Sequence, residues 1–80
     1  MTAYAERLRV AEMEAARKLG ELPPMHLEMA IRELDSLDHD PESAHLEADR
    51  ILLCALKGAG LHGVALKWLV VKEMAGFWYA

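Results

Sequence analysis

Three side chains near the middle of the sequence have the chemistry and spacing of metal ligands. Glu42, His45 and Asp49 lie three and four positions apart, so on a helix they share an arc of about 60°. Helical bundles use Glu-x-x-His in di-iron and di-manganese sites, where a second such helix and further Glu residues complete the ligand set. The chain has no second copy of this motif. This pattern predicts a divalent-metal enzyme only if a dimer brings two copies together.

A structural role is the alternative for His45 and Asp49. Four positions apart on one helix, the two side chains can share a charge-assisted hydrogen bond, which lowers the cost of placing both near a core. The terminal segment GFWYA carries Trp78 and Tyr79, whose N–H and O–H groups usually seek a partner when they are buried. We therefore predict a clamp in which His45 and Asp49 hold Trp78 and Tyr79 against the third helix. This interpretation needs no cofactor.

Other candidate sites match their motifs poorly. His39 and Asp40 resemble the His-Asp doublet of metal-dependent phosphohydrolases, but that fold needs more helices than 80 residues provide. Cys54 is the only cysteine, so it has no partner for an internal disulfide or a CxxC motif. The loop GAGLHG lacks the Lys-Ser/Thr ending of a phosphate-binding P-loop. None of these patterns supports a catalytic assignment.

Four helices are expected to carry these side chains. The first two are predicted over residues 3–19 and 24–37, because apolar residues recur in each at spacings of three and four, and GELPP separates them. The third begins at Asp40, a good N-cap followed by a proline, and ends at Gly58 or Gly60. The last spans residues 64–75, and a strand through ALKWLVV is its alternative. Helix is preferred because no other segment could supply partner strands.

The expected fold is therefore all-α: a small bundle of about four short helices, forming one domain over residues 1–80. The first two helices should make a hairpin that packs against the second pair. The aromatic C-terminal tail should fold back onto this bundle, since exposed aromatic side chains would form a sticky patch.

The last helix has apolar residues on two sides. One stripe contains Val64, Trp68, Val71 and Ala75, and the other contains Leu66, Val70 and Met74. A chain of this length has too little material to cover both stripes, so the pattern favours a homodimer. We predict that the interaction surface comprises Leu66, Val70, Met74 and Phe77.

Composition and charge limit the classes of partner that the sequence favours. The formal charge of -4 and the interleaving of Arg and Lys with Glu leave no basic stripe for nucleic acid. Charged residues interrupt the most apolar segment, so no membrane span is expected. The N-terminal segment has charges throughout, unlike a signal peptide, and we expect a cytoplasmic protein. Binding of the last helix and tail to a membrane surface is a weaker alternative, because few basic residues lie there.

The second half of the sequence resembles a group of small helical proteins from bacteria and their phages. The shared pattern is His-x-x-Ala-Asp-x-x-Leu, a short helix, and Trp-Tyr-Ala; the matching residues are His45, Ala48, Asp49, Leu52, Trp78, Tyr79 and Ala80. The resemblance implies that the His-Asp pair and the aromatic tail belong together, and it implies no activity. The predicted function is a non-enzymatic interaction or assembly module, and a metal-dependent enzyme using Glu42, His45 and Asp49 is the alternative.

Overall fold

The computed structural model of the chain describes residues 3–37 and 40–75. Its helices are α1 (Ala3–Glu21), α2 (Leu27–Asp35), α3 (Pro41–Gly58) and α4 (His62–Ala75). No strand occurs in the described ranges, and ALKWLVV lies within α4. The predicted all-α fold is confirmed, and the alternative strand assignment is wrong.

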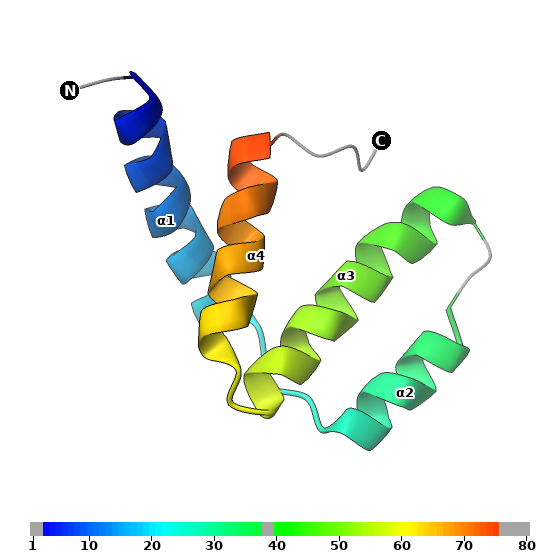
Figure 1. The fold of residues 1–80 in the computed structure, drawn as a ribbon. Coiled ribbons are helices and arrows are strands. Elements are labelled where there is room, and N and C mark those ends of the chain that lie inside the picture. Colours follow the sequence, from blue (N-terminus) through cyan, green and yellow to red (C-terminus); the bar gives the residue numbers. More distant parts are fainter. Residues whose placement is uncertain (1–2, 38–39, 76–80) are drawn as a thin grey trace.

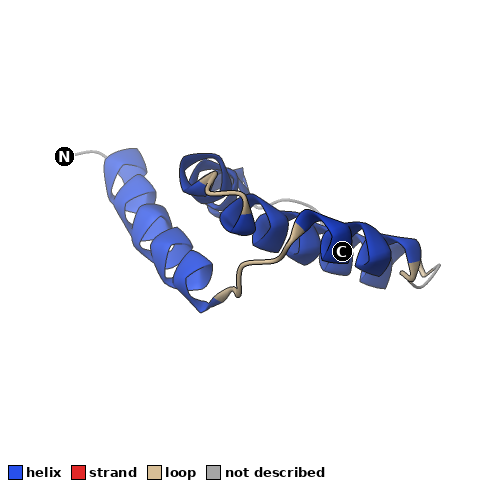
Figure 2. Ribbon diagram, turned by 90° about the horizontal axis from the view of Figure 1, so that it is seen from below, coloured by secondary structure: helices blue, strands red, loops and turns tan. Residues whose placement is uncertain are grey.

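The helices form two pairs that diverge from a common end. Figure 1 shows α1 beside α4 and α2 beside α3, with the pairs closest where α3 ends and α4 begins. Figure 2 shows the same arrangement from below, with α1 inclined to the other helices. The Cα radius of gyration is 13.8 Å, larger than the roughly 12 Å of a compact domain of this length. The bundle is therefore open, and large apolar side chains such as Leu52 and Val64 stay exposed.

The helix pairing corrects the predicted hairpin of the first two helices, because α1 packs against α4 while α2 packs against α3. Pro23 and Pro24 have no amide donor and favour extended backbone, so the linker between α1 and α2 continues across α3 instead of reversing. The Met25 amide donates to the carbonyl oxygen of Cys54 at 2.9 Å. This backbone hydrogen bond fixes the linker on α3 and directs α2 along that helix.

Local capping explains where two of the helices begin. Asp40 accepts a hydrogen bond from the Ser43 amide at 3.1 Å and Pro41 occupies the first turn, as predicted for the third helix. For α2, the His26 side chain accepts from the Glu28 amide at 3.2 Å. The second helix therefore starts three residues later than its predicted start at Pro24.

In the part of the chain that the structure describes, the core consists of two small clusters, one for each helix pair. The cluster between α1 and α4, joined by one residue of α3, contains Ala11, Ala15, Leu19, Leu53, Ala65, Leu69 and Val70. The cluster between α2 and α3 contains Ala30, Ile51 and Ala55. Small alanines let the helices approach closely, but each buries little apolar area. Two separate small clusters give the fold a modest hydrophobic stabilisation.

A lysine from α3 caps the end of α1. Lys57 Nζ donates to the carbonyl oxygens of Leu19 and Leu22, both at 2.7 Å, and lies 3.5 Å from that of Gly20. The last carbonyls of a helix have no intrahelical partner and carry partial negative charge. Lys57 therefore stabilises the end of α1 and joins it to α3.

Replacing Lys57 with methionine should lower the free energy of unfolding by about 1.5 kcal/mol, because it removes a charged donor from half-buried carbonyls but keeps most of the apolar stem. Urea unfolding followed by circular dichroism would measure the loss. Amide hydrogen exchange should also accelerate in the last turn of α1. Unchanged stability and unchanged exchange would mean that water donates hydrogen bonds to these carbonyl oxygens as well as Lys57 does.

Candidate functional site

An apolar groove lies along α3, between α2 and α4. It has a volume of about 520 Å³, and the described residues that line it are all apolar: Leu27, Leu52, Leu53, Ala55, Leu56, Ala59, Leu61, Val64 and Trp68. Leu52 and Val64 remain 53% and 57% exposed. A contiguous set of half-exposed large apolar side chains on a small domain marks a surface that binds another apolar surface.

The groove continues along the outer side of α4. Val64 and Trp68 also line an adjoining hollow, together with Gly63, Lys67 and Val71. Val64, Trp68 and Val71 belong to the first of the two apolar stripes predicted on the last helix, and all three are exposed. This stripe extends the apolar surface of the groove.

The other stripe of α4 lies toward the cluster between α1 and α4. Val70 is only 6% exposed, and Leu66 and Met74 pack against the cluster between α1 and α4. Phe77 lies outside the described residues. Within one chain this cluster therefore takes up Val70 and the partly buried Leu66 and Met74, while the opposite stripe of α4 stays exposed.

Asp49 connects α3 to α4 beside the groove. Its Oδ1 accepts a hydrogen bond from Trp68 Nε1 at 2.6 Å, and its Oδ2 pairs with the Lys72 ammonium. The side chains of Asp49 and Lys72 are 12% and 20% exposed. A charge-assisted pair with little solvent access holds its partners firmly. Asp49 therefore fixes the Trp68 indole, whose ring forms part of the groove wall.

The predicted metal ligands do not come together as a binding group. Both oxygens of Asp49 are engaged by α4, while Glu42 and His45 lie on the exposed part of α3. Within residues 3–37 and 40–75 no three His, Cys, Asp or Glu side chains are arranged to hold a metal ion.

The predicted clamp falls partly outside the described part of the chain. Trp78 and Tyr79 belong to the segment that is not described, so their contact with His45 and Asp49 stays a prediction. The observed partner of Asp49 is an indole N–H, the expected type of donor, but Trp68 supplies it. Trp68 lies 19 positions after Asp49, and no local spacing in the sequence could have indicated this contact.

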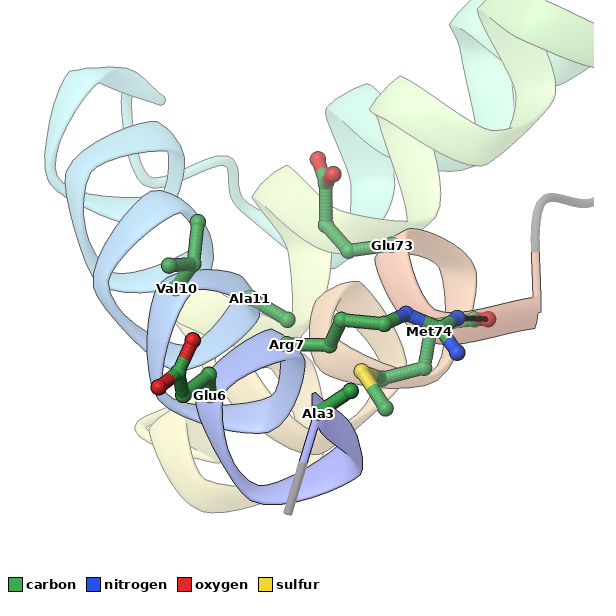
Figure 3. A pocket seen from close by; sticks show the side chains of 7 residues that line it. All are labelled: Ala3, Glu6, Arg7, Val10, Ala11, Glu73 and Met74. Atoms are coloured by element: carbon green, nitrogen blue, oxygen red, sulfur yellow. Dashed lines mark hydrogen bonds between the residues drawn. The ribbon is translucent and has the colours of Figure 1, made fainter. Parts of the chain in front are cut away.

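A second hollow, of about 430 Å³, lies where the start of α1 meets the end of α4. Figure 3 shows Arg7 extending from α1 across to Met74, while Glu73 points away from it. The Arg7 guanidinium donates to the Met74 carbonyl oxygen at 3.1 Å, and Glu73 pairs with Lys18. These polar contacts join α1 to the last turn of α4, which gives this hollow a structural explanation.

Shifted pKa values occur at ion pairs on the helix surfaces. The hydrogen bond and charge of Arg17 lower the pKa of Glu14, and Glu14 in turn raises the pKa of Arg17. On α3, the hydrogen bond from Arg50 to Glu47 raises the pKa of Arg50, against the opposing effect of burial. None of these three groups lines the groove, so the shifts reflect helix-surface pairing.

Comparison with known protein families, curated proteins and solved structures found no match to this chain. None of the helices in the described part of the chain is long and apolar enough to cross a membrane.

Proposed function

We propose that this chain is a non-enzymatic assembly module that acts as a homodimer through the groove along α3. The observation that carries the proposal is the groove itself, whose lining among residues 3–37 and 40–75 is entirely apolar and which continues onto the exposed stripe of α4. A cytoplasmic location and a phage-related origin belong to the same proposal, and the resemblance of the second half of the sequence supports the phage-related origin.

A second copy is the occupant that the surface favours. From their exposed fractions, the large apolar residues of the groove and stripe expose roughly 600 Å² together, at the upper limit for a typical monomer. This area approaches the ~800 Å² that each partner contributes to a standard interface. A second copy packed on the groove would cover the half-exposed side chains of Leu52 and Val64. Dimerisation thus buries apolar surface that one chain of 80 residues leaves exposed.

The test is the molar mass of the chain in solution. Sedimentation equilibrium should give twice the 9.0 kDa of one chain. Leu52→Glu places a charge in the centre of the groove and should weaken dimerisation about thirtyfold, because burying an unpaired carboxylate is costly. Leu52 is half exposed within one chain, so the variant should still fold, which circular dichroism would verify.

Met13→Glu is the matched control. Met13 is also an exposed apolar residue, but it lies on α1 and does not line the groove. This variant should dimerise like the original chain. A monomeric original chain, or equal weakening by both substitutions, would contradict the proposal.

A further inference from the structure

The two edges of the groove carry opposite charge. On the α2 side, Leu27, Ile31 and Asp35 follow one another at spacings of four, so they form one row, and Glu28 lies beside Ile31. On the α4 side, Lys67 lines the hollow that adjoins the groove. Arg32 lies on the same side of α2, four positions after Glu28 and three before Asp35. Two carboxylates and one guanidinium leave the α2 edge with a net negative charge, while Lys67 makes the α4 edge positive.

Arg32 lies near both acidic residues of the α2 edge, but no ion pair in the described part of one chain joins it to either of them. The ion pairs of residues 3–37 and 40–75 do not include Glu28, Asp35 or Lys67. The other α4 charges have partners, since Lys72 pairs with Asp49 and Glu73 pairs with Lys18. Lys67 is thus the α4 charge left to interact with a molecule bound in the groove.

We infer that two copies dock face to face about a twofold axis running along α3, so that Glu28 and Asp35 of each copy meet Lys67 of the other. In such a symmetric interface the same patch on both copies must be complementary to itself. A twofold axis along the central helix places α2 over α4 of the second copy and superimposes the two rows of Leu52 and Leu56. A twofold axis in the interface plane but perpendicular to α3 would instead place α2 of one copy on α2 of the other, so that the two acidic edges would meet.

This inference rests on the proposed homodimer and adds its orientation and the residues that select it. Charges at the rim of an interface act chiefly on orientation and partner choice, while the apolar centre supplies most of the affinity. Increasing salt should therefore weaken the dimer moderately, because screening at 0.1 M has a length of about 10 Å.

Two charge-reversed variants provide the test. Lys67→Glu makes both edges acidic, and the double variant Glu28→Lys with Asp35→Lys makes both edges basic. Each variant alone should form its homodimer about tenfold more weakly, because the symmetric interface contains two repelling contacts. Mixed in equal amounts, the two variants should form a heterodimer with an affinity within about threefold of the original chain, since both contacts are again between opposite charges.

Native mass spectrometry and sedimentation would measure these affinities, with Glu12→Lys on α1 as a charge-matched control that should leave dimerisation unchanged. If the original chain is monomeric, the proposed function itself is wrong. A dimeric original chain whose variants associate equally well, or whose mixture gives no preference for the heterodimer, leaves the homodimer in place and overturns the orientation. Tighter association of Lys67→Glu also overturns it.

Discussion

Replacing Gly58 with alanine is expected to lower the free energy of unfolding by about 3 kcal/mol, because the added methyl group has no room. A Cβ at this position would meet the Met25 carbonyl oxygen and lie 2.8 Å from the Met25 carbonyl carbon and nitrogen. These are backbone atoms, so the linker between α1 and α2 would have to move off α3. The same movement would break the hydrogen bond from Met25 to Cys54. A chain of this size has a net stability of only roughly 4–12 kcal/mol.

Urea unfolding would measure this loss, and the Met25 amide should lose its protection from hydrogen exchange. Gly20→Ala is the control, because a Cβ at Gly20 meets nothing within 4 Å and alanine favours the helix. Gly58 does not have the positive φ that Gly60 has, so backbone strain does not confuse the comparison. Equal stability of Gly58→Ala and the original chain would show that the linker does not lie on α3 in solution.

Asp49→Ala is expected to cost about 3 kcal/mol, since it removes the carboxylate from the partly buried Lys72 ammonium and from the Trp68 N–H. The groove should also lose the fixed Trp68 ring. In a Trp78→Phe background, where Trp68 is the only indole, its fluorescence should shift to longer wavelength as the ring becomes more exposed. Asp49→Asn, which keeps an acceptor for Trp68, should cause a smaller shift.

A double-mutant cycle with Lys72→Met separates the ion pair from general disruption of α3, because only interacting residues give a coupling free energy. Glu14→Ala is the control for an exposed pair. It removes the partner of Arg17, both side chains are about half exposed, and pairs of this kind contribute little. Zero coupling between Asp49 and Lys72, with unchanged Trp68 fluorescence, would contradict the role of Asp49 in joining α3 to α4.

The features of this fold that were predictable from the sequence are local. Periodic apolar residues indicated each of the helices, and Asp40 with Pro41 indicated the start of α3 within one residue. The same reasoning could not indicate helix pairing, because an amphipathic stripe shows that a face is covered without showing which helix covers it. The linker backbone at Met25 and the small alanines of α1 decided the pairing through contacts between distant segments.

The site was predictable only in outline for the same reason. The spacing of apolar residues predicted two apolar stripes on α4. Whether the stripe with Val64 and Trp68 or the stripe with Val70 is buried depended on the position of α1. Likewise Asp49 stood out as a charged residue on an apolar face, although its partners lie on another helix. The groove combines three helices, so its existence depends on the angles between them, which no single segment encodes.

The pairing of α1 with α4 also has a consequence for the order in which the chain assembles. Lys18 and Glu73 are 55 positions apart, whereas α2 and α3 are neighbours in the chain. Contacts between near segments close faster than contacts that must first close a long loop. The inner hairpin of α2 and α3 should therefore form first, both on refolding and on the ribosome. Because α1 precedes its partner α4 in the chain, it is synthesised earlier and its buried face, which contains Ala11, Ala15 and Leu19, stays uncovered until α4 emerges.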